Sequence, residues 1–175
     1  SPFIILVKTA IMSLTLTSCE DEYIASGLEG TWEGYTHMQA EYHERYYNST
    51  YSYVDFTTDP FRFTSGYGHW VDYYSGAPWD YIASNIEWRV RDGVIEIKFI
   101  EDGYTLYIDR YRLTDNHFTG RAYSDDGYNY EFDLVHTSSP RWDDYYYGWD
   151  DGYYYAPAKG GAKAPVKERP QRVLR

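Results

Sequence analysis

The sequence predicts an all-β protein in which an antiparallel meander closes into a barrel of eight or nine strands. Three observations carry this prediction. Aromatic side chains make up 21% of the 175 residues, with 23 tyrosines among them, and aromatic enrichment favours strands. Apolar and polar residues alternate over short segments that recur about every ten residues between turn signals. No window shows the 3.6-residue apolar period of an amphipathic helix.

The most regular strands lie in the second half of the chain. Ile86, Trp88 and Val90 alternate with charged residues, and Asp92-Gly93 follows them as a strong hairpin signal. The same alternation recurs at 95–99, 106–109, 118–123 and 130–134, with turns expected at 101–103, 114–116 and 125–127. This spacing is typical of an antiparallel meander.

Strands in the first half alternate less cleanly. The sequence predicts strands at 32–38 and about 50–57, a hairpin formed by 61–63 and 67–74 around a turn at 65–66, and a connection or lid with Gly and Pro at 75–83. With these elements the barrel reaches eight or nine strands. That number is enough to close a barrel and so remove the exposed edges of an open sheet.

The residues that open the first strand resemble a known family. The string GLEGTW at 27–32 is similar to the G-x-W opening of lipocalin-like barrels, and the run 30–140 is similar to the small lipocalin-like lipoproteins of Bacteroidetes, for which no activity is generally assigned. The resemblance implies a lipocalin-like barrel in which Trp32 has a structural role, packing in the core at the barrel base. In lipocalins this tryptophan packs against a basic residue late in the barrel. Whether Arg121 or another arginine takes that part stays open.

The only cysteine of the chain lies in the string LTSC at 16–19, after a short apolar run and before three acidic residues. A large aliphatic residue three positions before a cysteine, with small residues between, resembles the lipobox of bacterial lipoproteins. The resemblance implies that Cys19 carries a lipid once a signal peptide at 1–18 is removed. A lone cysteine in an exported protein cannot form an internal disulfide, which favours lipidation. The alternative is a free buried thiol after a signal peptide of another kind, or a chance match. Residues 2–16 are too short for a membrane-spanning helix, which needs about 20 apolar residues.

The implied lipid anchor predicts the location of the protein. We expect it in the outer membrane, with the membrane as a partner through the lipid on Cys19. The acidic residues that follow Cys19 resemble the surface-export signal of Bacteroidetes lipoproteins. We therefore expect display at the cell surface, or otherwise on the periplasmic face.

Charge is divided unevenly along the chain. The net charge is −11, yet residues 156–175 carry six Lys or Arg and one Glu, so the remainder carries −16. An acidic domain of this kind excludes nucleic acid as a partner, because phosphate backbones need a basic surface. The sequence thus predicts a signal peptide at 1–18, an anchor linker at 19–29, a lipocalin-like β-barrel at 30–140, a Tyr/Trp/Asp-rich extension at 141–155 and a basic disordered tail at 156–175. The extension is either an adhesive arm for a partner or sugars, or a segment that wraps over the barrel with its tyrosines packed.

Nothing in the sequence argues for an enzyme. The G-x-S-x-G, Walker and H-E-x-x-H patterns are absent. His37, Glu41 and His43 share one strand parity, but residues six apart on an extended strand lie about 20 Å from each other, too far for a shared zinc ion. The adjacent acid pairs beside turn glycines match turn chemistry rather than calcium ligation. We therefore expect no catalysis, no metal and no cofactor.

Aromatic side chains form the best candidate for a binding surface. They gather around the 75–83 connection, and loops at a barrel mouth are where ligands enter, although the same rings would also fill a narrow barrel. The candidate ligand-binding residues are Tyr67, Trp70, Tyr73, Tyr74, Trp79 and Tyr81. We expect a non-catalytic binder of a small apolar molecule or a glycan. The alternative is a structural or accessory subunit that docks on an outer-membrane protein complex.

Overall fold

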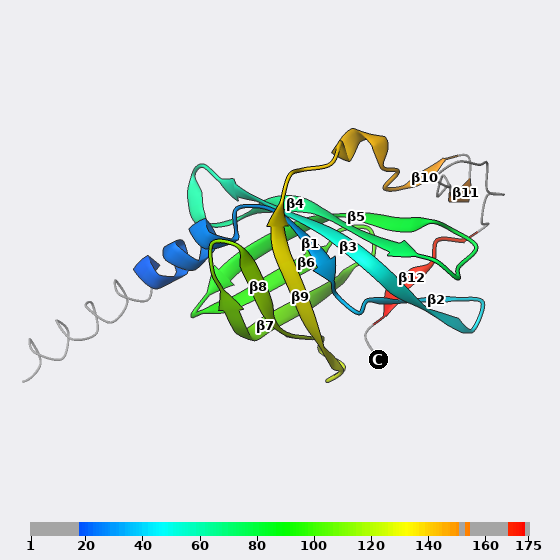
Figure 1. Ribbon diagram of the computed structural model, residues 1–175, viewed down its shortest axis with the longest axis horizontal. Coiled ribbons are helices and arrows are strands. Elements are labelled where there is room, and N and C mark those ends of the chain that lie inside the picture. The colour runs from blue at the N-terminus through cyan, green and yellow to red at the C-terminus, as the bar shows by residue number, and fades with distance from the viewer. Residues whose placement is uncertain (1–17, 151–152, 155–167, 174–175) are drawn as a thin grey trace, which may run out of the picture.

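Eight antiparallel strands close into a barrel in the computed structural model, which describes residues 18–150, 153–154 and 168–173 (Figure 1). Closure follows because β1 pairs with both β3 and β9. The barrel strands are β1 (Gly30–Tyr35), β3 (Arg45–Asp59), β4 (Arg62–Tyr74), β5 (Tyr81–Arg91), β6 (Val94–Phe99), β7 (Tyr104–Leu113), β8 (His117–Tyr123) and β9 (Asn129–Thr137). The prediction of an all-β meander closing into an eight- or nine-stranded barrel is confirmed.

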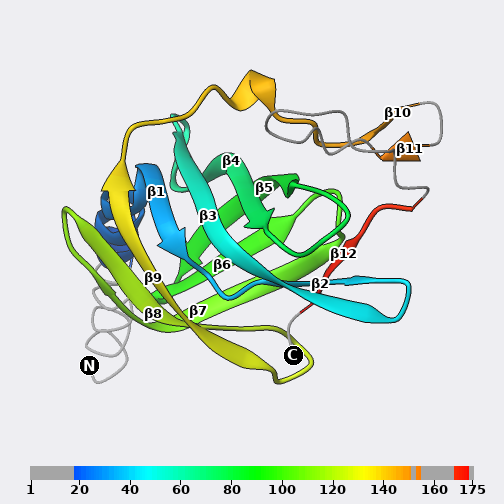
Figure 2. The ribbon, with the colours of Figure 1, turned by 45° about the vertical axis from the view of Figure 1, so that its right-hand side comes forward.

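Short elements extend the sheet at one end of the barrel. The strand β2 (Gln39–Tyr42) pairs with β3, and β12 (Gln171–Val173) pairs with β2. The 3-10 turn η1 (Trp142–Asp144) follows β9, and β10 (Trp149–Asp150) pairs with β11 (Tyr153–Tyr154). Figure 2 shows β12 lying beside β2. In the described part of the chain, no helix is long and apolar enough to cross a membrane.

The alternation in the second half sets the register of the barrel strands there. Trp88 of β5 pairs with Ile97 of β6, which pairs with Leu106 of β7, and all three side chains are buried in the core. Charged partners alternate with them on the outer face, such as Arg89 opposite Glu96. Burial on one face fixes this register, because a slip of one residue would turn the whole apolar row to solvent.

The predicted turn at 65–66 is wrong. Strand β4 runs unbroken through these residues, and the chain turns before β4, where the Phe61 N–H donates to Asp59 Oδ1 at 2.8 Å. A Cβ at Gly66 would lie 1.9 Å from the carbonyl oxygen of Thr57 on β3. The glycine therefore serves the close approach of two strand backbones rather than a turn.

A helix that the sequence did not predict covers one end of the barrel. Residues 18–28 are helical, within the stretch expected to be an anchor linker (Figure 1). Leu28 is fully buried, and the Asp21 carboxylate accepts the backbone N–H groups of Asp92 and Gly93 at 2.9 and 2.8 Å. The buried residues of this helix recur at helical spacing. The first of them is the acid Asp21, so the buried positions do not form a purely apolar pattern that would indicate a helix in the sequence.

Trp32 lies at the base of the barrel, beside this helix. Its side chain is fully buried, and its indole N–H donates to the Leu28 carbonyl at 2.8 Å. Its ring meets the imidazole of His136 on β9 edge-on, with centroids 4.3 Å apart. His136 thus lies where the family resemblance places a basic residue, whereas Arg121 pairs with Glu131 on the surface.

The expectation of a disordered basic tail is wrong for residues 168–173. Strand β12 pairs with β2, placing Arg172 opposite Ala40, and the Arg172 side chain is fully buried. This burial is possible because two carboxylates, those of Asp72 and Asp102, lie inside the end of the barrel and pair with the guanidinium. The remaining tail residues, 156–167 and 174–175, lie outside the described part of the chain.

Candidate functional site

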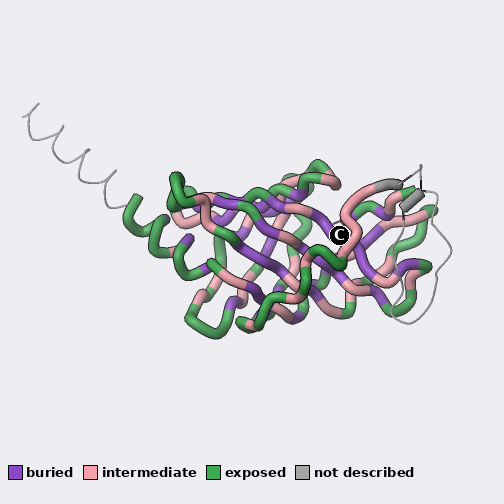
Figure 3. Tube along the Cα trace, turned by 90° about the horizontal axis from the view of Figure 1, so that it is seen from above, coloured by how far each residue is buried: buried purple, intermediate pink, exposed green. Residues whose placement is uncertain are grey.

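The interior of the barrel is filled by its own side chains. Buried residues follow the barrel strands, whereas the helix surface and the turns are largely exposed (Figure 3). The cavity inside the barrel has a volume of about 10 Å³, space for roughly one water molecule, and side chains such as Phe56, Ile97 and Phe132 line it. In this conformation the cavity does not offer a preformed site for an apolar ligand.

The six aromatic residues expected to bind a ligand do not share one pocket. Trp70 points into the barrel, and its indole N–H donates to Asp72 Oδ1 at 2.8 Å. Tyr74 and Trp79 are buried in a second cluster with Ala40 of β2, their ring centroids 5.6 Å apart. These three rings therefore pack in the interior of the molecule.

The other three candidate rings lie outside the barrel. Tyr73 and Tyr81 pack beneath Tyr145 of the extension, and the hydroxyl oxygens of Tyr73 and Tyr145 are 2.5 Å apart. Tyr67 is 58% exposed. Successive residues of a strand point to opposite faces, so Tyr73 and Tyr74 diverge despite being neighbours in sequence. Proximity in sequence therefore does not create one aromatic surface here.

Residues 142–147 of the extension pack on the outer face of β4 and β5. Trp142 stacks on His69, with ring centroids 4.8 Å apart and planes 13° from parallel. The Tyr146 N–H donates to the Tyr81 hydroxyl at 3.0 Å. For these residues the structure matches the interpretation of a segment that wraps over the barrel with its tyrosines packed.

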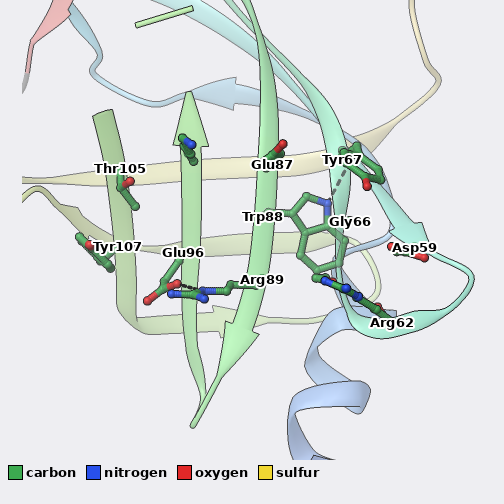
Figure 4. Close-up of a pocket in the computed structure, with 12 residues that line it drawn as sticks. Asp59, Arg62, Gly66, Tyr67, Glu87, Trp88, Arg89, Glu96, Thr105 and Tyr107 are labelled. Carbon is green, nitrogen blue, oxygen red and sulfur yellow. Dashed lines mark hydrogen bonds and ion pairs between the residues drawn. The ribbon is translucent and has the colours of Figure 1, made fainter. Parts of the chain in front are cut away.

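Tyr67 borders a polar groove of about 550 Å³ on the outside of β4 to β7 (Figure 4). Arg89 of β5 forms an ion pair with Glu96 of β6 in this groove. The indole of the buried Trp88 lies at the inner side of the groove, and its N–H donates to the Tyr67 carbonyl at 2.9 Å. Three acidic residues (Asp59, Glu87, Glu96) and three basic residues (Arg62, Arg89, Lys98) line the groove, so its formal charges balance.

A buried ionic cluster lies at the other end of the barrel from the helix. We call this end the mouth; β2, β12 and the turns at 100–103 and 124–128 border it. Arg172 enters the mouth from β12. Its Nε donates to Asp72 Oδ2 and its Nη1 donates to Asp102 Oδ2, each at 2.7 Å. All three side chains are at most 3% exposed.

Other groups of the barrel accept the remaining hydrogen bonds of the Arg172 guanidinium. Nη1 also donates to Ser84 Oγ, and Nη2 donates to the carbonyls of Trp70 at 3.0 Å and Ile82 at 2.7 Å. A guanidinium has five N–H donors, and these contacts with the two carboxylate contacts use all five. The buried charge is therefore both paired and fully hydrogen-bonded, which is what burial of an ion requires.

Asp72 is positioned by the barrel itself. Its Oδ1 accepts hydrogen bonds from the Trp70 indole at 2.8 Å, from Ser52 Oγ at 2.5 Å and from Thr36 Oγ1 at 3.3 Å. These donors belong to the barrel strands and to the segment that leaves β1, not to the tail. They hold one carboxylate oxygen and leave the other, Oδ2, for Arg172.

Asp102 lies in the turn between β6 and β7 and faces two guanidiniums. Besides Arg172, Arg169 donates to its Oδ1 at 3.3 Å from Nη2, and Ser84 Oγ donates to its Oδ2 at 2.8 Å. Burial acts to raise the pKa of the Asp102 carboxyl, but the charges of Arg172 and Arg169 outweigh it and lower the pKa below the ordinary value of 3.8. Asp102 is therefore an anion at neutral pH.

This lowered pKa predicts an acid-sensitive tail. A carboxyl with a depressed folded-state pKa contributes stability above its unfolded pKa, here 3.8, and loses that contribution as the pH falls through the folded value. We expect urea unfolding to show a loss of stability below about pH 4, and the variant Asp102→Asn to lose less between pH 6 and pH 3 than the unaltered chain. An unchanged pH dependence in Asp102→Asn would contradict this assignment.

Aromatic rings complete the mouth around the ions. The Arg172 guanidinium carbon lies 5.0 Å from the centre of the Phe99 ring, a cation–π distance. Tyr74, Tyr104 and Tyr130 lie near the cluster, and burial raises the pKa of each phenol above 10. The phenols thus stay neutral, and the charges inside the mouth are those of the carboxylates and guanidiniums.

Outside Arg172 the mouth widens into a hollow of about 540 Å³. Glu41, Asp125 and Asp126 line it, so its charge matches the acidic balance of the barrel. Ser124 also lines the hollow, and its buried Oγ has no hydrogen-bond partner among the described residues. The wall of the mouth therefore holds a polar group that could accept or donate a further hydrogen bond.

The charged residues of this cluster, Asp72, Asp102 and Arg172, are not among the site residues predicted from the sequence. One signal was available, because Trp70, Asp72 and Tyr74 share one strand parity, which places an acid on the apolar face of β4. A buried carboxylate needs a cationic partner or several hydrogen-bond donors. Nothing in the sequence pattern distinguishes Arg172 from the other arginines as that partner.

Comparison with known proteins bears on the barrel. A family model described as a lipocalin-like domain matches residues 28–120, more than half of the chain. The match begins at the end of the helix and reaches into β8. No curated protein and no solved structure matches the chain.

Proposed function

The chain belongs to the lipocalin-like domain family, and on this premise we propose that it is a lipid-anchored, non-catalytic binding protein whose ligand enters at the mouth. One observation carries the proposal. The mouth holds a buried carboxylate, Asp72, that three barrel donors position in advance, whereas the interior below it is closed. Positioned polar groups in a concave site at a barrel mouth are the usual elements of a ligand site.

The anchor is proposed at the opposite end. Cys19 is exposed on the helix, and only two residues later Asp21 binds the turn between β5 and β6. A lipid on Cys19 would therefore hold the helix end of the barrel toward the membrane and leave the mouth facing away. By its resemblance to Bacteroidetes lipoproteins, we place the protein in the outer membrane at the cell surface.

Exposed aromatic rings near the helix support this orientation. Phe61 and Phe63, in and next to the turn between β3 and β4, are 91% and 61% exposed. This turn lies at the helix end, since Thr58 Oγ1 donates to Glu29 Oε2 at 2.8 Å just after the helix. Aromatic rings favour the interface between lipid and water, so a membrane beneath Cys19 would cover them.

The lipid anchor is tested by replacing Cys19 with alanine. We expect the unaltered chain to fractionate with membranes and its mass to show a lipid-modified residue at Cys19 as the N-terminus. The variant Cys19→Ala is expected to be released into the soluble fraction, because it lacks the thiol that would carry the proposed lipid. Equal retention of both proteins, or an unmodified Cys19 in the membrane fraction, would overturn the anchor.

The mouth accommodates a ligand more easily than the barrel interior does. A small apolar molecule would need the core side chains around the 10 Å³ cavity to move apart, which costs packing energy throughout the core. A ligand at the mouth meets acids, neutral phenols and a hollow of about 540 Å³ without that cost. The mouth is therefore the better candidate for either a polar small molecule or a glycan.

A docking subunit for an outer-membrane protein complex is the second candidate. The outer groove on β4 to β7 favours it, because the exposed Tyr67 and the ion pair of Arg89 with Glu96 line the same groove (Figure 4). Aromatic residues and arginine are enriched in protein interfaces. In that case the filled barrel would serve as a rigid support for this surface.

A further inference from the structure

We propose that the mouth is a recognition site for a guanidinium group, and that the chain's own Arg172 occupies it as a tethered ligand. This inference rests on the proposed function, because it names the class of ligand for the same mouth. Arg172 contacts Asp72, Asp102, Ser84 and two carbonyl oxygens there, and all of these acceptors belong to β4, β5 or the turn after β6. The acceptors therefore remain in the barrel when the tail leaves.

The geometry selects a guanidinium over an ammonium ion. Five N–H donors of one planar group reach five acceptors, and the Phe99 ring lies 5.0 Å from the guanidinium carbon. An ammonium ion has three donors and no plane to place over a ring. It would leave at least two of these five contacts unmade.

The barrel does not depend on β12 for closure. The pairing of β1 with β3 closes it, while β12 pairs by three residues with β2 at the edge of the sheet. A short edge strand of this kind is the element that β-strand addition exchanges. Release of β12 would remove Arg172 from both Asp72 and Asp102, and Asp102 already lines the hollow.

Two sources present a guanidinium to such a site. One is a small free compound; the other is an arginine on an extended peptide that adds to β2 as β12 does. In both cases the ligand must displace Arg172, so the unaltered chain would bind it weakly. Removing the Arg172 side chain would free Asp72 Oδ2 and the carbonyls of Trp70 and Ile82 for such a ligand, while Arg169 still contacts Asp102.

The test uses the full chain with Arg172→Ala and ethylguanidinium, which replaces the lost side-chain head. We expect the variant to melt at a lower temperature than the unaltered chain, and ethylguanidinium to raise its Tm by about 5 °C at saturation. Ethylammonium at the same concentration is expected to raise it by less than half as much. If the variant is unfolded, ethylguanidinium is expected to restore its near-ultraviolet circular dichroism.

Matched variants separate site binding from general salt effects. Arg121→Ala removes an exposed arginine and should show no response that the unaltered chain lacks. The double variant Arg172→Ala with Asp72→Asn should lose the response, because the positioned carboxylate is gone. A response that persists in the double variant, or an equal response to ethylammonium, would overturn guanidinium recognition.

A peptide with the sequence of residues 168–175 distinguishes the two sources. Stabilisation of Arg172→Ala at a concentration at least tenfold below that needed for ethylguanidinium supports a strand-borne arginine, whereas equal potency supports a free compound. Glucose and hexanol complete the panel. If either stabilises the variant while ethylguanidinium does not, the guanidinium inference fails and binding at the mouth stands. If no probe changes the Tm or restores the fold, both proposals fail.

Discussion

Replacing Asp72 by alanine is expected to lower the free energy of unfolding by about 3–5 kcal/mol. The change removes one of the two carboxylates that pair with the fully buried Arg172. It also leaves the indole N–H of Trp70 and the hydroxyls of Ser52 and Thr36 without their common acceptor. Each buried donor left unpaired adds its own desolvation cost.

Urea unfolding of the purified chain measures this loss. The matched control is Glu131→Ala, which breaks an ion pair with Arg121 whose side chains are 76% and 47% exposed. Exposed pairs contribute about 0–1 kcal/mol, so this variant should unfold almost as the unaltered chain does. A loss below about 1 kcal/mol for Asp72→Ala would show that Arg172 does not depend on the mouth for its partner.

Replacing Trp32 by alanine is expected to cost about 3–5 kcal/mol. Its indole is fully buried between the helix and the barrel, and it links them through the hydrogen bond to the Leu28 carbonyl. Alanine would leave a cavity at the barrel base and remove the edge-on contact with His136. The helix should loosen together with the core.

Two variants make this prediction specific. Trp32→Phe keeps an aromatic ring and loses the hydrogen bond, so a smaller loss is expected. Tyr35→Ala, on the same strand but 59% exposed, should change stability little. Unfolding in urea followed by circular dichroism provides the comparison. Equal losses for Trp32→Ala and Tyr35→Ala would contradict the packing role of Trp32.

The sequence predicted the second half of the barrel well for a physical reason. Alternation of apolar and charged residues fixes both the strands and their register, as Trp88 opposite Ile97 shows. Turn signals such as Asp92-Gly93 then mark where each hairpin reverses; in the structure Asp92 has a φ of 50° and Gly93 a φ of 78°. Local pattern and global fold agree in this region.

The strands of the first half were harder to predict, because glycine occurs both in turns and where two strand backbones approach closely. At Gly66 the absent Cβ allows two strand backbones to approach, and the sequence alone reads the same residue as a turn. The helix over residues 18–28 was missed for a related reason. One of its buried positions holds Asp21, whose partners are backbone N–H groups 71 and 72 residues away.

The mouth illustrates what a single sequence leaves undetermined. Asp72 sits at an inward position of β4 and so indicates a buried acid, but its guanidinium partner comes from a residue 100 positions later. Asp102 looks like an ordinary turn acid in the string EDG, and only the fold brings it beside Arg172. Likewise, Tyr73 and Tyr74 of the expected aromatic site are neighbours on β4, so their rings lie on opposite faces of the sheet.

That the Arg172 guanidinium occupies the mouth is tested most directly by the rate at which its Nε–H hydrogen exchanges with water. In the ¹⁵N-labelled chain, nuclear magnetic resonance measures how fast each arginine Nε–H exchanges with water. We predict that the Arg172 Nε–H, bonded to Asp72 at 2.7 Å and fully buried, exchanges at least 100-fold more slowly than that of the exposed Arg121, and that Asp72→Asn removes most of this protection. Equal exchange rates for Arg172 and Arg121 would contradict the account.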